Sequence, residues 1–476
     1  RFLTHIRGTP AYWEKSKRDL FAMIRQLGIP TFFVTFSAAD RRWIEIDNAI
    51  LISQGKPRMS EEQHKNMSWE QHCDIIMSNP VAAARMFQQR VYTFINDVIM
   101  SEANPIGKVQ DYYYRTEFQQ RGWPHIHMVV WVQNAPRYSE DPEDEVIEFI
   151  DKYISCEVPP ESDEELHEIV TSVQTHSKNH TKSCRKGGKV CRYNFPKPPS
   201  NRTFICEPVD RVHGNEDDPN YQADLDNRKE EENQAKQRLK TIWEILADSD
   251  ADETEWDEIL NRAGITQSEF EKCLATLAQR RTPYLKRRVK DQWINNYNPH
   301  LIRCWNGNMD IQYVLDPYAV AMYIVSYITK SEREMGDLLK NAQREASEGN
   351  TDAIQQLRKL GSVYLQNREI SVMGAIYLIC SMPLRNSTRN VIFLQTSSDG
   401  QKISLPLEQL QANAGKSEQV WMPTQIEKYI GRPHSAKYNN MCMARFFSSH
   451  YQVSNAAGNA CSCLLYTSDA ADEEAG

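Results

Sequence analysis

The sequence predicts an α+β fold built on an antiparallel sheet that is flanked by helices. Residues 16–30 carry apolar side chains at helical spacing and end in a Gly and a Pro, which predicts a helix. Residues 31–37 (TFFVTFS) are β-branched and aromatic, which is typical of a buried strand. Residues 111–118 and 125–132 are strand-like runs on either side of a turn near residues 121–122. We therefore expect a hairpin, whose two strands are antiparallel.

Helices account for much of the remaining pattern, and no internal repeat is visible. Residues 228–247 and 266–280 have helical spacing, and the cap-like TQSE segment starts the second. Asp316-Pro317 is a good N-cap and N1 pair for a helix that extends to residue 343. Residues 137–168 are acidic and contain prolines, which predicts a loop and an exposed helix. Residues 370–410 mix short helix and strand.

The charge is unevenly distributed along the 476 residues. The formal net charge is −8, but residues 139–168 carry a net −12 and residues 207–258 another −12. The rest of the chain is therefore basic, with a net +16. A basic body with two acidic insertions favours a polyanion as partner. The acidic runs themselves are interpreted as solvated segments.

Composition excludes two classes of protein. No apolar run approaches the roughly 20 residues that a membrane-spanning helix needs, so we expect no membrane partner. The 11 cysteines are scattered and odd in number, which favours reduced thiols and a metal site over a secreted disulfide framework.

The two ends of the sequence are expected not to be native ends. The chain begins at Arg1, as a fragment would, and the segment CLLYTSDAADE (463–473) looks like the translation of a sequencing-library adapter. We therefore expect residues 461–476 to be read-through and the natural protein to continue past residue 460. The Gly-Lys-Ser at 415–417 lacks the earlier Gly of a phosphate loop, because Leu410 stands there, so no ATP site is expected.

Two histidines occupy an unusual place in the second strand of the hairpin. His125 and His127 alternate with apolar residues, so both fall on the face that carries Val129 and Trp131. An unpaired polar group in such a strand is costly. If Phe118 packs on the other face, Glu117 and Gln119 join the histidines, and imidazole with an oxygen ligand suits a divalent metal. The alternative is a pair of ordinary hydrogen-bonded histidines.

A candidate nucleophile lies in the helix after Pro317. Tyr323 and Tyr327 are four residues apart and share a helix face, and Lys330 can sit beside Tyr327. A phenol needs a nearby positive charge or a metal-polarised substrate to attack. The alternative is that the two tyrosines form an ordinary amphipathic stripe.

Together these segments resemble the HUH single-strand DNA nucleases and, within them, the helicase-like N-terminal domain of the Helitron group of rolling-circle transposases. The resemblance rests on four stretches, at residues 18–40, 117–127, 298–332 and 426–433. It implies an HUH (Rep-like) core in which His125 and His127 bind Mg²⁺ or Mn²⁺, with Glu117 or Gln119 as third ligand.

The same resemblance implies the chemistry and the partners. Tyr323 and Tyr327 match the paired nucleophiles and Lys330 the lysine that follows. The reaction would leave a 5′-phosphotyrosine and a free 3′-hydroxyl on single-stranded DNA at the transposon ends. A C-terminal helicase domain and a nuclear location are expected. The competing hypothesis is a catalytically inactive, zinc-containing nucleic-acid-binding module from a decayed or domesticated element.

A second metal site is predicted between the two acidic runs. His176, His180, Cys184 and Cys191 form an H-x3-H-x3-C-x6-C array, and four N and S donors suit a structural Zn²⁺ site. A similar cluster is common in the Helitron group. Arg185, Lys186, Lys189 and Arg192 lie among the ligands and would face DNA phosphates. The alternative is a basic loop with incidental Cys and His.

A basic run at residues 279–290 is a candidate contact for single-stranded DNA. It offers charges for phosphates, with Tyr284 and Trp293 available for stacking on bases. The alternative is a solvated basic helix. The predicted DNA contacts are Arg280, Arg281, Lys286, Arg287, Arg288 and Lys290.

These features divide the sequence into seven predicted segments. They are the first part of the nuclease core (1–136), an acidic insertion (137–169), the zinc-binding insertion (170–205), a second acidic insertion with a helix (206–265), the tyrosine-helix part of the core (266–345), a C-terminal α/β extension (346–460) and the read-through (461–476).

Overall fold

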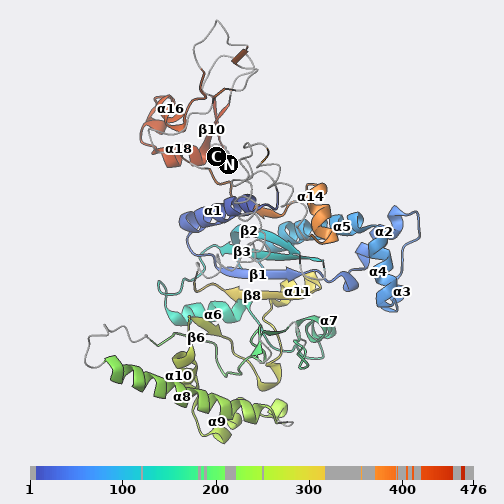
Figure 1. Cartoon of the computed structure of the whole chain (residues 1–476), viewed down its shortest axis with the longest axis vertical. Helices are drawn as coiled ribbons and strands as arrows, with labels where there is room; N and C mark the ends of the chain where they lie inside the picture. The colour runs from blue at the N-terminus through green and yellow to red at the C-terminus, as the bar shows by residue number, and fades with distance from the viewer. Residues whose placement is uncertain are drawn as a thin grey trace. The chain divides into compact units, whose positions relative to one another are not determined.

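A five-stranded antiparallel sheet in the order β8-β1-β3-β2-β9 organises the first of two units in the chain, residues 1–389 (Figure 1). The computed structural model describes residues 7–118, 122–180, 184–186, 190–209, 221–248, 251–316, 355, 370–392, 394, 404–405, 410–411, 420–453 and 463–466. The strands of the sheet are β1 (Phe32–Ser37), β2 (Val109–Phe118), β3 (Pro124–Val132), β8 (Met309–Tyr313) and β9 (Arg385–Ser387). The predicted α+β class and the antiparallel hairpin β2–β3 are confirmed.

Strand alternation divides the sheet into two faces with separate cores. The larger core contains Phe32, Val34, Ile126 and Met128 from the two central strands. It is covered by helices that include α2 (Ile44–Ser53), α5 (Pro80–Phe94), α6 (Glu143–Tyr153), α11 (Pro299–Trp305) and α14 (Val372–Ile379).

The opposite face is packed against a single described helix, α1 (Pro10–Leu27), which lies along the sheet (Figure 1). Leu20 and Met23 of this helix contact Phe33, Val129 and Trp131. The helix begins earlier than the predicted residue 16, since Thr9 caps it and Pro10 occupies N1.

Helices α2 to α4 form a small helical group after β1. The 3₁₀ turn η2 (Asp40–Arg42) precedes α2, and α3 (Glu61–Lys65) and α4 (Trp69–Ser78) follow it. The helix α5 continues into a π-helical turn, η3 (Ile95–Ile99), before the hairpin.

The acidic segment after β3 is more than a solvated loop. Its helix α6 buries Val146 and Ile150 in the larger core, which corrects the prediction of an exposed helix. The helix α7 (Glu164–Ile169) follows and continues into the π-helical turn η4 (Val170–Gln174). The short strands of this region are β4 (Arg185–Lys186), β5 (Val190–Cys191), β6 (Phe204–Cys206) and β7 (Thr282–Tyr284).

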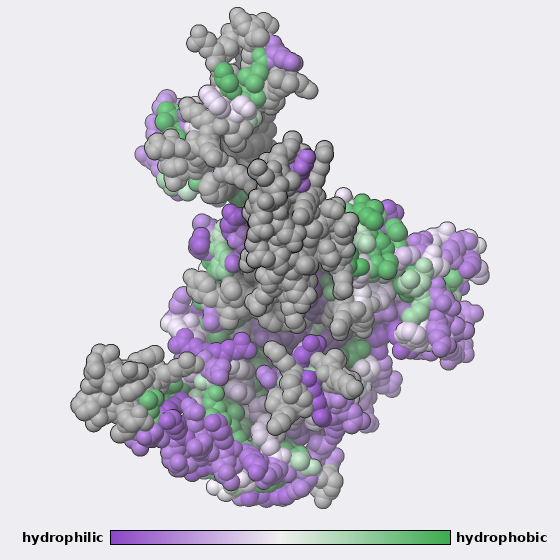
Figure 2. All heavy atoms as spheres, viewed as in Figure 1, coloured by the Kyte–Doolittle hydropathy of each residue, from purple (hydrophilic) through white to green (hydrophobic). Residues whose placement is uncertain are grey.

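The second acidic stretch builds a core of its own. The long helix α8 (Tyr221–Leu246) packs with α9 (Trp256–Ala263) and α10 (Gln267–Leu277) around Trp256, Ile259 and Phe270. The 3₁₀ turns η5 (Ala251–Glu253) and η6 (Val289–Asp291) border this group. Figure 2 shows a largely hydrophilic surface over α8, as expected for a helix with a charged outer side. The Thr266–Glu269 capping box that starts α10 was predicted and is confirmed.

The second unit, residues 390–476, contains α16 (Gln425–Ile430), α17 (Ala436–Asn439), α18 (Met443–Ser449), β10 (His450–Val453) and β11 (Cys463–Tyr466). Tyr429 and Phe446 pack their rings together within it, 5.7 Å between centroids. Within the described ranges of the whole chain, no helix is long and apolar enough to cross a bilayer.

Candidate functional site

The hairpin places His125, His127 and Glu117 on one face of the sheet. Glu117 is the register partner of His125 and reaches diagonally to His127, with 2.6 Å between its Oε2 and His127 Nε2. The two imidazole rings lie 4.6 Å apart and nearly perpendicular. The three side chains therefore lie close together on one face of the sheet.

The neighbouring strand β1 supports both histidines. Ser37 is the register partner of His125, and its Oγ lies 3.0 Å from His125 Nδ1. Phe33 stacks on the His127 ring at 6.0 Å and 15°. His127 is buried at 3 % exposure, whereas His125 and Glu117 are only partly buried. The pair thus has one buried ring and one partly exposed ring near the start of β3.

The histidines and Glu117 are close, but not converged like a closed metal site. Among the described residues, two other groups of side chains each have ligand atoms that all lie within 4.8 Å of one another. His125, His127 and Glu117 are not such a group. Gln119, Tyr323, Tyr327 and Lys330, the alternative ligand and the predicted tyrosine-site residues, lie outside the described residues.

Sequence inspection missed polar residues that share the histidine face. Thr35 pairs with both His127 and Asp310, and Arg115 pairs with His127 from the other side, so these side chains form one row across four strands. Desolvation raises the pKa of the Asp310 carboxyl, and the nearby Lys197 ammonium partly offsets this. The guanidinium of Arg115 lies 4.2 Å from the centre of the Trp13 ring. The signal that would have found Asp310 is the alternation of β8, a strand that was not predicted.

The predicted His/Cys array converges into one cluster. Cys184 Sγ lies 3.2 Å from His176 Nε2, 3.4 Å from His180 Nδ1 and 3.2 Å from Cys191 Sγ. Ligands around a tetrahedral Zn²⁺ are separated by about 3.3–3.8 Å, given Zn–S near 2.3 Å and Zn–N near 2.0 Å. The donor set fits a structural zinc ion, and binding the ion would move the side chains apart by a few tenths of an ångström.

Aromatic side chains and backbone donors surround this cluster. The rings of Phe195 and Trp293 lie 4.6 Å and 6.2 Å from the His176 ring. Burial disfavours the Cys191 thiolate, but the backbone N–H groups of Phe195 and Tyr193, together with Cys184 and Lys197, lower the pKa of Cys191. Burial and the neighbouring Cys191 raise the pKa of Cys184. A stabilised thiolate is the form that binds a metal. Trp293 thus packs in the cluster, where it had been predicted to stack on DNA.

The basic run at residues 279–290 is not a continuous helix, since it contains β7, a loop and the start of the 3₁₀ turn η6. Arg280, Lys286 and Lys290 are exposed. Arg281 pairs with Glu207, and Arg288 with Asp291. Tyr284 stacks on Phe204 at 5.2 Å and is not displayed for a base.

Arg287 differs from its neighbours because its guanidinium is buried at 4 % exposure. Its Nη1 donates to the carbonyls of Asp291 and Ile294 at 2.8 and 2.7 Å, and its Nη2 donates to Asn296 at 3.2 Å. Arg287 therefore serves the fold in this conformation and is not presented to a phosphate. Of the other predicted phosphate contacts, Arg185 and Arg192 are exposed beside the cluster, and Lys189 lies beyond the described part.

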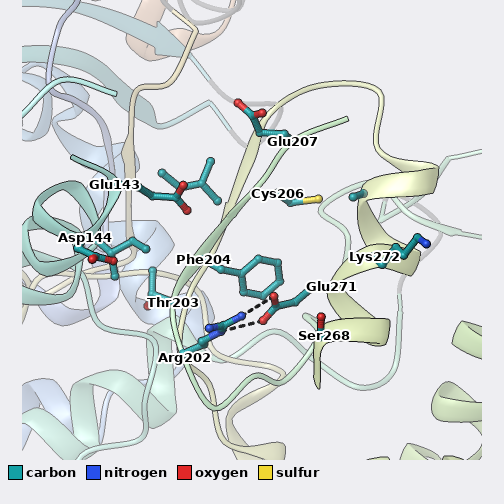
Figure 3. Close-up of a pocket in the computed structure, with 13 residues that line it drawn as sticks. Glu143, Asp144, Arg202, Thr203, Phe204, Cys206, Glu207, Ser268, Glu271 and Lys272 are labelled. Carbon is teal, nitrogen blue, oxygen red and sulfur yellow. Dashed lines mark hydrogen bonds and ion pairs between the residues drawn. The ribbon is translucent and has the colours of Figure 1, made fainter. Parts of the chain in front are cut away.

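A pocket lies elsewhere, between α6, β6 and α10. It measures about 600 Å³. Figure 3 shows that Glu143, Asp144 and Glu207 surround it, while its Arg202 is paired with Glu271. Excess carboxylates disfavour a phosphate ligand, and no residue of the histidine face lines this pocket. We therefore place the candidate site on the hairpin.

A comparison with protein families covers this part of the chain. Residues 1–130 match the Helitron helicase-like domain at N-terminus. This segment is therefore similar to a Helitron-like N-terminal domain. It contains α1, β1, β2 and both histidines of β3, so the candidate site lies within the matched Helitron-like segment. Two of the four stretches that carry the resemblance, at 18–40 and 117–127, fall inside the match. No curated protein in the comparison matches the chain.

Proposed function

We propose that this chain is a metal-dependent single-stranded DNA endonuclease and strand transferase of a rolling-circle transposon. The observation that supports it best is the His125–His127 pair with Glu117 on one face of the central hairpin. This set lies in the segment that matches a Helitron helicase-like domain, which is a transposon-related domain. The proposal includes a nuclear location and a helicase domain in the full-length protein.

The residues of this face would have different roles in phosphodiester cleavage. His125, His127 and Glu117 would hold Mg²⁺ or Mn²⁺, which polarises the scissile phosphate when bound. Ser37 fixes the ring of His125, so that its other nitrogen can turn to the metal. On metal binding, Glu117 would exchange its contact with His127 for a contact with the cation.

The nucleophile in this proposal is Tyr323 or Tyr327, with Lys330 favouring the phenolate. The phenolate oxygen attacks phosphorus, the bond from phosphorus to the 3′ oxygen breaks, and that oxygen leaves as a 3′-hydroxyl after taking a proton. The 5′ end stays on the tyrosine as a phosphodiester. Because the linkage keeps its phosphodiester energy, a second 3′-hydroxyl can reverse the step, which is strand transfer without ATP.

The His/Cys cluster has a supporting role in this proposal. Zn²⁺ held by its four side chains would fix a basic loop, and Arg185 and Arg192 are exposed beside the ligands. With Arg280, Lys286 and Lys290 they form a set of exposed cations for single-strand phosphates.

The proposal is tested with a fluorescently labelled single-stranded oligonucleotide incubated with Mn²⁺. We expect a covalent adduct that survives denaturation and disappears in the double variant Tyr323→Phe/Tyr327→Phe. The His127→Ala variant should also lose it. Tyr92→Phe, at a side chain that is 60 % exposed on α5, is the matched control and should keep the adduct.

DNA binding without a covalent adduct would favour the competing hypothesis. Salt-sensitive DNA binding without any adduct, over varied sequences and metals, would show a zinc-containing nucleic-acid-binding module with no active nuclease. Loss of the adduct in Tyr92→Phe would show that the assay reports general damage to the fold.

A further inference from the structure

A second group of metal-type ligands lies away from the hairpin, in the helices that follow β1. Asp47 of α2, His64 of α3 and His72 of α4 bring one ligand atom each to within 4.8 Å of one another. Asp47 is fully buried and His72 is 3 % exposed, while His64 is partly buried. None of the three belongs to the proposed nuclease or to the His/Cys cluster.

The two histidines end two similar five-residue stretches. Residues 60–64 read SEEQH and residues 68–72 read SWEQH, so a serine, a glutamine and a histidine recur at the same spacing. In both helices the serine and the glutamine form a capping box. A capping box fixes the first turn of its helix. Each histidine, next after the glutamine, is therefore held at a defined place above α2.

The distances between the three side chains are those of a ligand set, and one of them, from His72 Nδ1 to Asp47 Oδ2, is also a hydrogen bond. His64 Nε2 lies 3.1 Å from Asp47 Oδ2, yet no hydrogen bond to the described residues is aligned at this nitrogen. His72 Nδ1 lies 3.2 Å from the same oxygen. Two ligand atoms of a tetrahedral site, each about 2.0–2.1 Å from the metal, are about 3.3 Å apart.

The buried charge of Asp47 also calls for a positive partner, which a metal ion or a protonated His72 can supply. Asp47 is a fully buried carboxylate, and its Oδ1 makes no hydrogen bond within the described part of the chain. A buried charge is costly unless it is paired or binds a metal. Asp40 stands on the far side of His72, with Oδ2 3.4 Å from Nε2. A carboxylate behind a histidine is the usual outer partner of a metal-bound imidazole, because it orients the ring.

We propose that Asp47, His64 and His72 bind a divalent transition-metal cation of the zinc type, with Asp40 orienting His72 and water completing the coordination. Two imidazoles and one carboxylate are a donor set that Zn²⁺ accepts. The bound ion ties α3 and α4 to α2, where the short helix α3 buries no residue of its own. This inference is independent of the proposed nuclease.

The first experiment counts metal in the full-length chain by elemental mass spectrometry after gel filtration. We expect the His64→Ala variant to contain one equivalent of zinc less than the wild type, whether or not Cys184→Ser/Cys191→Ser removes another. His300→Ala, an exposed histidine on α11, is the matched control and should keep the wild-type content. Equal zinc content in His64→Ala and the wild type would overturn the proposal. Asp40→Asn should weaken binding by about 10–100-fold.

A ligand exchange keeps the test decisive if His64→Ala fails to fold. In the Cys184→Ser/Cys191→Ser background, loading with Co²⁺ should give visible d–d bands without a thiolate charge-transfer band. Adding His64→Cys should then create that charge-transfer band, because a thiolate enters the coordination sphere. A Co²⁺ spectrum that does not change on His64→Cys would place the metal elsewhere. A Co²⁺ spectrum that is absent in this background would show that the three residues share only a proton.

Discussion

Replacing Arg287 should destabilise the fold, whereas replacing its exposed basic neighbours should weaken DNA binding. In Arg287→Ala, three charge-assisted hydrogen bonds to the Asp291 and Ile294 carbonyls and to Asn296 are lost. Each such bond contributes about 1.5–3 kcal/mol. Removing the buried charge offsets part of that sum, so we expect the free energy of unfolding to fall by about 3–5 kcal/mol. Lys286→Ala, at the exposed neighbour, should change it by less than about 0.5 kcal/mol.

The two variants are compared by urea unfolding and by binding to single-stranded DNA at several salt concentrations. Lys286→Ala should weaken binding and reduce the salt slope by about 1, as expected for one lost phosphate contact. Arg287→Ala, measured below its unfolding transition, should keep the wild-type slope. The reasoning fails if Arg287→Ala is as stable as the wild type and loses DNA affinity in the way Lys286→Ala does.

Three further outcomes follow from single features of the fold. A chelator should lower the Tm of the wild type more than that of Cys184→Ser, because the variant has already lost its zinc ligand set; equal shifts would argue against metal in the cluster. Burial raises the pKa of Cys156 to about 11, so at pH 8 iodoacetamide should label the exposed Cys304 first, and peptide mass spectrometry that finds equal rates would contradict this. Gly107→Ala should cost about 1–3 kcal/mol in chemical denaturation, since Gly107 has φ +87° and a Cβ would lie 2.7 Å from Val132; wild-type stability would refute the clash.

Local pattern predicted the centre of the sheet because strand alternation is a property of neighbouring residues. It assigned His127 and Val129 to one face and Ile126 and Met128 to the other, as the two cores confirm. It did not predict β8, a short strand whose pairing with β1 joins residues far apart in sequence. Asp310 was therefore missed.

The candidate sites were predictable only where ligands are close in sequence or carried by one strand. The His/Cys array and the H-x-H pair meet this condition. Asp47, His64 and His72 do not, because three separate helices supply them. The burial of Arg287 could not be predicted from the basic run that contains it. Its partners are mostly backbone carbonyls, which every residue provides.

The strand order of the central sheet has a consequence for biosynthesis. The strands β1, β2 and β3 are translated by residue 132, but β8, which covers the outer edge of β1, arrives only at residues 309–313. Until then the nascent chain carries an open strand edge that can pair with another chain. The two acidic runs, each with a net charge of −12, are translated in this interval. Their like charges would oppose the close approach of a second nascent chain until β8 covers that edge.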